Sequence, residues 1–203
     1  VIDTFRNMMM SGDKLTAFSG IMSGSLSYVF GRLDDGIPFS KAVLEARERG
    51  FTEPDPRDDL SGKDVARKAL IIAREAGFRP ELSDVRVDSV FPPDFDMTGS
   101  VADFLARLPA ADAHFAKIAD RLAKEGKVLR YCAEVSGSGA PVRVGAVEVA
   151  LADPLAAVKN GENAFVFTTK YYSPIPLVIR GYGAGADVTA SGVFADILRT
   201  AKW

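Results

Sequence analysis

Apolar residues recur every three or four positions through the first half of the chain, the spacing that places them on one face of a helix. The stretches 2–9, 23–33 and 39–49 each show this spacing. The third stretch stops at Gly50, a residue type that readily takes the left-handed conformation found at helix C-termini. These segments predict three amphipathic helices.

A fourth helix is predicted to start near Ser61. Ser61 and Asp64 have the spacing of an N-terminal capping pattern, and apolar residues cover most of the circumference of the helix that follows. This pattern indicates a helix that is largely buried. Two further amphipathic stretches lie between Gly99 and Gly126.

From about Val128 the period falls towards two, which is typical of β-strands with one buried face. The strand candidates are four apolar segments: 128–135, 142–149, 164–172 and 176–181. The first two flank a Ser-Gly-Ser-Gly turn at 136–139 and predict a hairpin, and a final helix is expected over 187–199. Helices first and hairpin-linked strands later favour one α+β domain over residues 1–203, with helices packed on one face of a mainly antiparallel or mixed sheet.

The composition limits the partners. The chain has 203 residues, and its 25 Lys and Arg nearly balance 27 Asp and Glu, so no basic field favours nucleic acid or anionic lipid. No apolar run approaches the roughly 20 residues that cross a membrane, and a cytoplasmic location is expected. The single cysteine, Cys132, is expected to be a buried apolar residue rather than part of a disulfide. Because the chain begins at Val1, we expect it to be part of a longer polypeptide.

The stretch 51–68, FTEPDPRDDLSGKDVARK, concentrates acidic and basic residues around two prolines. Pro54 and Pro56 each fix one backbone dihedral and disfavour helix at the preceding residue, so a stiff, extended segment is predicted. Asp64 and Lys68 lie four residues apart on the predicted helix, and a surface ion pair is the simpler interpretation. In the alternative interpretation, the carboxylates bind an ammonium group and Lys68 exchanges a proton with a hydroxyl or carbonyl oxygen.

Metal and nucleophile chemistries fit the sequence poorly. An EF-hand register that starts at Asp55 would place Leu60 where glycine belongs and Ala66 where the bidentate glutamate belongs. The only histidine, His114, and the single cysteine are too few for a zinc site or a Ser-His-Asp triad within this chain. We therefore predict no metal site, and His114 is expected to be structural or exposed.

A second glycine-rich segment, VIRGYGAGADVTASGVFADIL, fits a strand, a turn and a helix. Gly181, Gly183 and Ala186 match the loose dinucleotide-binding fingerprint, but a Rossmann unit also needs a second parallel strand and an acidic residue about twenty residues further on. A tight turn capped by Asp187 is the simpler expectation. The other option is that Gly185 lets a cofactor bound elsewhere approach the backbone.

Four stretches together resemble the homoserine dehydrogenases, and most closely the dehydrogenase part of the bifunctional aspartokinase/homoserine dehydrogenases. In chain order they are FSGIMSGSLSYVFGRLDDG, RERGFTEPDPRDDLSGKDVARKALIIARE, VKNGENAFVF and PLVIRGYGAGADVTASGVFADILRT. The run EPDPRDDLSGxDVARK is the most specific part, and the resemblance covers nearly the whole chain. It implies a reversible NADP- or NAD-dependent reduction of L-aspartate 4-semialdehyde to L-homoserine, a step of threonine and methionine biosynthesis.

The resemblance also implies residue roles on the substrate side. Lys68 would transfer the proton to the substrate oxygen, and Glu53 and Asp64 would bind the amino acid. Asp59 would support the site. The alternative is a non-catalytic amino-acid-binding or oligomerisation module.

On the cofactor side, the resemblance implies that Gly50 and Gly185 lie against the nicotinamide end. A Rossmann domain absent from this chain would bind the rest, with the helix 187–199 packed toward it, and the isolated fragment would have little or no turnover. A homodimer or higher homo-oligomer would form through the sheet. Phe51 stands where many relatives have tyrosine and Ala186 where close relatives often have asparagine, so both positions lose a polar group.

Overall fold

A computed structural model of the chain describes residues 1–138 and 141–201. The helices are α1 Ile2–Met10, α2 Gly24–Asp34, α3 Phe39–Glu48, α4 Pro56–Leu60, α5 Lys63–Glu75, α6 Val101–Arg107, α7 Asp112–Lys124 and α8 Ala186–Thr200, with short 3-10 turns at Leu82–Asp84 and Leu108–Ala111. The strands are β1 Leu15–Ile21, β2 Val85–Val87, β3 Lys127–Ser136, β4 Val142–Ala150, β5 Glu162–Thr169 and β6 Leu177–Tyr182.

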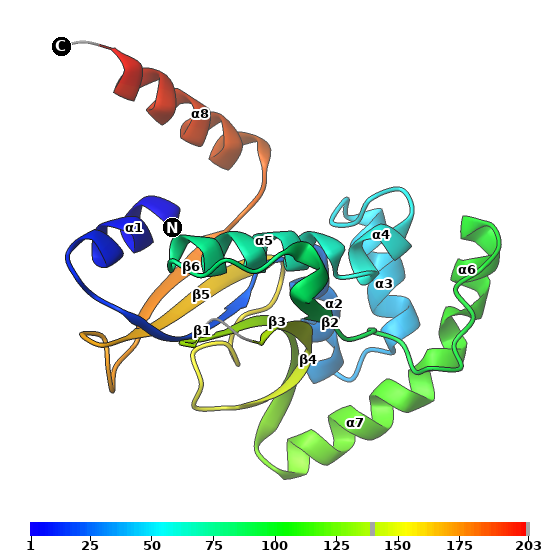
Figure 1. Ribbon diagram of the computed structural model, residues 1–203. Coiled ribbons are helices and arrows are strands. Elements are labelled where there is room, and N and C mark those ends of the chain that lie inside the picture. Colours follow the sequence, from blue (N-terminus) through cyan, green and yellow to red (C-terminus); the bar gives the residue numbers. More distant parts are fainter. Residues whose placement is uncertain (139–140, 202–203) are drawn as a thin grey trace.

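The strands form one six-stranded mixed sheet in the order β2-β4-β3-β1-β5-β6 (Figure 1). Neighbouring strands are antiparallel except for β2 and β4, which are parallel. The predicted hairpin is β3 and β4, with Val135 opposite Val142, although Gly139 of its turn lies outside the described residues. The prediction of an α+β fold with a mixed sheet is confirmed.

The two faces of the sheet are covered differently. Along β3, Tyr131 and Ala133 join the main core, to which α1, α2, α3, α5 and α7 contribute. Cys132 points the opposite way and packs in a smaller cluster with Leu155 and Val158 from the segment before β5. Helices thus cover one face, as predicted, and burial raises the pKa of the Cys132 thiol, as expected for an inert apolar residue.

The charged stretch differs from its prediction in two ways. Residues 56–60, expected to be extended, form the one-turn helix α4, because Asp55 accepts the backbone N–H of Arg57 at 3.0 Å and Pro56 takes the first helical position, where a missing N–H costs nothing. Ser61 was expected to cap α5 but instead closes α4. Gly62, with φ of 67°, precedes α5 without a side-chain cap, so the capping prediction was wrong.

The central strand β1 and the short edge strand β2 were not predicted. β1 pairs with β3 on one side and β5 on the other, and its residues Phe18, Gly20 and Ile21 are buried. A strand covered on both faces shows no clean alternation of polar and apolar residues, which is why the period-two test overlooked it.

Helix α8 lies outside the core at the end of the chain (Figure 1), and its Arg199 pairs with Asp3 of α1 at 3.0 Å. None of its residues is buried, and it exposes Val193, Phe194 and Ile197. The helix itself matches the prediction, but its first turn does not. Gly185 is the residue before the helix and no side chain caps it, so the expected cap by Asp187 was wrong.

Candidate functional site

Helix α5 carries the lysine that the sequence singled out. The buried face of α5 packs on the sheet, and Lys68 lies at the margin of that face with its side chain 43% exposed. Its Nζ lies 2.7 Å from Asp64 Oδ2 and donates a hydrogen bond to the backbone carbonyl of Met22 at 2.9 Å. An ammonium group has three N–H donors, so one of them remains for another acceptor. An exposed ion pair contributes little by itself, but the second bond, to a different segment, orients the amine.

A cavity of about 440 Å³ opens beside Lys68. Its lining includes Lys68 and Ile72 from α5, Asn163 and Phe165 from β5, and Ile179 and Gly181 from β6. The lysine therefore lies at the wall of a space large enough for a small ligand.

The carboxylate of Asp59 joins two segments of the predicted site. It accepts a hydrogen bond from Ser25 Oγ at 2.8 Å and one from the backbone N–H of Glu53 at 2.8 Å. Ser25 lies in the same segment, 22–25, whose first carbonyl binds Lys68. Lys68 and the acid-rich loop, residues 51–60, are thus both bonded to one short segment at the start of α2.

The acid-rich loop is fixed at a second point. Arg57 pairs with Asp55 at 2.6 Å and also donates to the backbone carbonyls of Met97 and Gly99, both at 2.9 Å. The hydrogen bonds that the Asp55 carboxylate accepts from the Arg57 guanidinium hold the pKa of Asp55 below its usual range, although partial burial opposes the shift. The prediction of a stiff loop agrees with this network, even though part of the loop is helical.

The two glycines expected at the cofactor have room around them. Gly50 has φ of 74°, which confirms its predicted left-handed conformation, and Gly185 has φ of 128°. A Cβ placed on either residue would meet no atom within 4 Å. Within the described residues, neither glycine lines the cavity beside Lys68, and Gly185 borders a separate hollow along α8 with Val193 and Phe194.

The predicted residues thus fall into two bonded pairs and two separate glycines. Asp64 contacts Lys68, and Asp59 contacts the backbone of Glu53, whose side chain is exposed. In the described part of the chain, Lys68 alone of these four lines the cavity.

Sequence reasoning missed three contributors to this region. The carbonyl of Met22 has no sequence signature, because any residue supplies one. Ser25 and Asn163 both lie in stretches that carry the family resemblance, and that resemblance is the signal that could have pointed to them. Among the described residues, Asn163 is one of four with a buried side-chain polar atom that has no hydrogen-bond partner, and it is the one of the four that lines the cavity beside Lys68.

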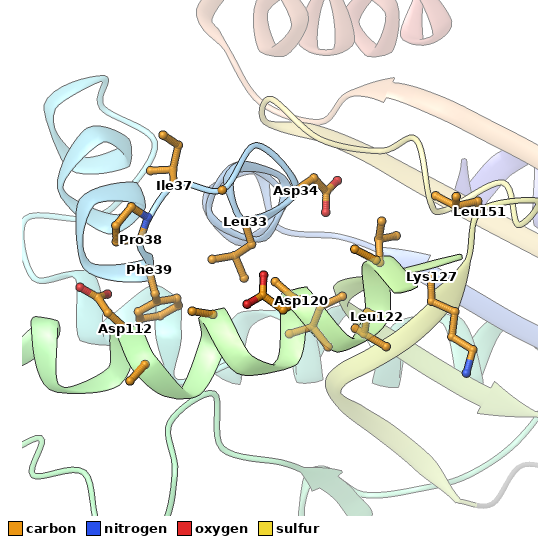
Figure 2. Close-up of a pocket in the computed structure, with 17 residues that line it drawn as sticks. Leu33, Asp34, Ile37, Pro38, Phe39, Asp112, Asp120, Leu122, Lys127 and Leu151 are labelled. Carbon is orange, nitrogen blue, oxygen red and sulfur yellow. The ribbon is translucent and has the colours of Figure 1, made fainter. Parts of the chain in front are cut away.

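A larger cavity, about 550 Å³, lies between α2, α3, α7 and the start of β3 (Figure 2). Two of its carboxylates, those of Asp34 and Asp112, are already engaged. Asp34 accepts hydrogen bonds from Arg130 at 3.1 and 2.6 Å, and Asp112 accepts the backbone N–H and the hydroxyl of Ser40, both at 2.7 Å. Its lining is otherwise mostly apolar, with Asp120 and Lys127 among the labelled side chains (Figure 2).

Neither His114 nor the acidic side chains form a metal site within the described residues. His114 is exposed, with its ring edge against Phe115, as expected. Within residues 1–138 and 141–201, no group of three or more His, Cys, Asp or Glu side chains is placed to hold a metal ion. Over the same residues, no helix has the length and apolar character needed to span a membrane.

The fold and the lysine site define an α+β domain that places an amine, oriented by a carboxylate and a carbonyl, at a cavity between a helix and a mixed sheet. The family model for homoserine dehydrogenase matches residues 1–198. The chain belongs to the homoserine dehydrogenase family.

Individual relatives agree with this assignment. A bifunctional aspartokinase/homoserine dehydrogenase of Haemophilus influenzae is 54% identical over 98% of this chain and 24% of its own length. A homoserine dehydrogenase of Emericella nidulans is 40% identical over 98% of this chain and 57% of its own length. A crystal structure of a Candida auris protein of unknown function superposes with a TM-score of 0.91, at 42% identity, over 98% of this chain and 57% of the other. The chain therefore spans between about a quarter and three fifths of the length of these relatives.

Proposed function

We propose that this chain is the substrate-binding and catalytic domain of an NADP- or NAD-dependent enzyme that interconverts L-homoserine and L-aspartate 4-semialdehyde. Membership of the homoserine dehydrogenase family supports the reaction. The single observation that carries the residue assignment is the position of Lys68, whose amine is held by Asp64 and Met22 at the wall of a cavity.

Lys68 is proposed to move the proton. In the reducing direction, its third N–H gives a proton to the carbonyl oxygen of the semialdehyde as hydride adds to the carbon, and the reverse step takes the proton from the homoserine hydroxyl. A bound nicotinamide cofactor supplies the hydride. The ion pair with the neighbouring carboxylate of Asp64 holds the amine in position for this step.

The carboxylates of Glu53 and Asp64 are proposed to bind the substrate ammonium group. Both side chains are exposed. Their carboxylates have acceptor lone pairs beyond those that the described donors occupy, and these can accept hydrogen bonds from an ammonium group. Asp59 is proposed to act indirectly, because its oxygens are taken by Ser25 and by the backbone of Glu53.

Gly50 and Gly185 are proposed to lie against the nicotinamide end of a cofactor, outside the lining of the cavity beside Lys68. Gly50 and Gly185 leave open space beside the backbone, and Asn163 offers a buried amide oxygen that lacks a partner in the described chain. We propose that the rest of the cofactor is bound by a Rossmann domain outside these residues. The isolated chain is then expected to show little or no turnover with homoserine and NADP.

The exposed apolar side chains of α8 are proposed to pack toward that cofactor domain, which would bury Val193, Phe194 and Ile197. A homodimer or higher homo-oligomer is proposed to form through the sheet, in the cytoplasm and without nucleic-acid partners. Light scattering on the intact protein measures the oligomeric state, and a monomer would contradict that part of the proposal.

The assignment is tested with Lys68→Met in the intact protein. Loss of a general acid and base is expected to lower kcat by about 10²- to 10⁴-fold while the homoserine KM changes much less. Lys63→Met is the matched control, because Lys63 is an exposed lysine on the same helix. Stopped-flow or steady-state absorbance of the reduced cofactor measures both variants.

Two results would overturn the assignment at different levels. Near-normal kcat in Lys68→Met would remove the lysine from the chemistry. Absence of homoserine-dependent reduction of NADP and of NAD by the intact wild-type protein would reject the proposed reaction and favour a non-catalytic amino-acid-binding module.

A further inference from the structure

The floor of the cavity beside Lys68 is formed by two adjacent strands. Asn163 on β5 lies directly opposite Gly181 on β6, and the next pair on the same face is Phe165 and Ile179. Side chains on this face point toward α5, because Phe165 packs against the main core while Ala164 joins the cluster on the opposite face. Asn163 therefore looks into the same cavity as Lys68.

The amide of Asn163 is not satisfied by the folded chain. Its Oδ1 is buried and has no hydrogen-bond partner among residues 1–138 and 141–201. Its Nδ2 packs closely against the backbone of Gly183, where a Cβ would collide with it, so the amide is held in place. A buried carbonyl without a donor is uncommon in folded proteins, and a ligand N–H or O–H in the cavity would satisfy it.

Gly181 has no structural reason to lack a side chain. Its φ is not in the left-handed region, and a Cβ built on it would meet no atom within 4 Å. Glycine weakens a strand unless a bulge or a close approach of another group requires it. The bare backbone of Gly181 beside Asn163 thus leaves a flat, open place on the floor of the cavity.

We propose, on the basis of the proposed function, that Asn163 and Gly181 form the seat of the nicotinamide ring, with Asn163 Oδ1 accepting a hydrogen bond from the NH₂ of the ring carboxamide. A primary carboxamide supplies the N–H that Oδ1 lacks, and a flat ring fits over a residue without a side chain. The substrate ammonium group is a poorer match, because the ionised carboxylates of Glu53 and Asp64 bind a cation more strongly than a neutral amide does. The ring in this seat would share the cavity with the amine of Lys68.

The test compares two cofactors that differ in one donor. 3-Acetylpyridine adenine dinucleotide keeps the carbonyl of the ring substituent but replaces its NH₂ with a methyl group. The dissociation constants of NAD and of this analogue are measured by calorimetry on the intact wild-type protein and on Asn163→Leu and Asn163→Ala. One lost hydrogen bond is expected to make the analogue bind about fivefold to tenfold more weakly to the wild type.

In both Asn163 variants this preference for NAD is expected to disappear. Gly181→Val is expected to weaken both cofactors about equally, since it fills the place of the ring and leaves the amide intact. The melting temperature of each variant reports whether it is folded, and Asn163→Ala serves if the larger replacement does not fold.

An unchanged preference for NAD in the Asn163 variants would overturn the inference. If the homoserine KM also rose in those variants, the amide would be assigned to the substrate instead. These outcomes are separate from failure of the proposed function, which would appear as a wild-type protein that neither binds a nicotinamide cofactor nor oxidises homoserine.

Discussion

Two of the cavities in the described part of the molecule, one beside α7 and one beside α5, differ in how far their polar groups are already hydrogen-bonded. Around the larger one, beside α7, Asp34 and Asp112 already bind Arg130 and Ser40. Around the smaller one, beside α5, Lys68 keeps a donor free and Asn163 has an acceptor without a partner in the described chain. At the larger cavity the carboxylates of Asp34 and Asp112 are paired within the chain. The smaller cavity has a lysine N–H and an amide oxygen without partners among the described residues.

This difference is a better guide to function than volume. A buried polar atom left without a partner costs free energy, so one in the lining of a cavity is a candidate contact for a ligand that supplies the missing bond. The apolar lining of the larger cavity can bury a ligand but offers little to orient one. The predictions below test whether chemistry is confined to the smaller cavity and the acid-rich loop next to it.

Apart from the change at the proposed catalytic lysine, the largest effect is expected from Asp59→Ala. This change breaks the bonds to Ser25 and to the backbone of Glu53, so the acid-rich loop shifts relative to α2. Misplacement by about 1 Å costs on the order of 10²-fold, and kcat/KM for homoserine is expected to fall by that amount. Asp58→Ala is the matched control because the Asp58 side chain is exposed next to it in sequence. Equal kinetics in the two variants would show that the bridge does not position the substrate.

The outcome for Asp59 also shows how much sequence alone can deliver. The motif 51–68 and the pair Asp64 and Lys68 were recognisable, since helical spacing fixes which side chains meet four residues apart. The bridge to Ser25 was not recognisable from spacing, because it joins residues 34 positions apart through the tertiary fold. The role of the Met22 carbonyl was hidden for the same reason.

The fold shows the same division between local and long-range information. Amphipathic helices and the hairpin of β3 and β4 could be predicted because each is a local pattern. The strand order could not, since β1 lies between β3 and β5, which are far from it in sequence. The prediction that Ser61 caps α5 failed because α4 ends at Ser61, and Gly62, in its left-handed conformation, makes the turn into α5.

A middle-sized effect, on stability and not on kinetics, is expected from Asp112→Ala. Helix α3 begins after Pro38, which has no side-chain acceptor, and Asp112 from α7 accepts the N–H and hydroxyl of Ser40 instead. Losing this cap is expected to cost about 1–2 kcal/mol, which lowers the melting temperature by about 2–8 °C for a chain of this size. Asp120→Ala is the control, since Asp120 lines the same cavity and is exposed. A raised homoserine KM in Asp112→Ala would place the larger cavity in the active site.

The smallest effect is expected from filling the larger cavity. Ala119 lies on the wall that α7 contributes and is half-buried, so Ala119→Leu extends a side chain into the open space. Added apolar contact is expected to raise the stability by no more than about 1 kcal/mol, with kcat and both KM values unchanged. Thermal unfolding and steady-state kinetics on the intact protein measure these quantities, with Gly181→Val as the comparison in the other cavity. If Ala119→Leu weakened the binding of homoserine or of the cofactor, the contrast between the two cavities would be wrong, because the cavity beside α7 would then be part of the substrate or cofactor site.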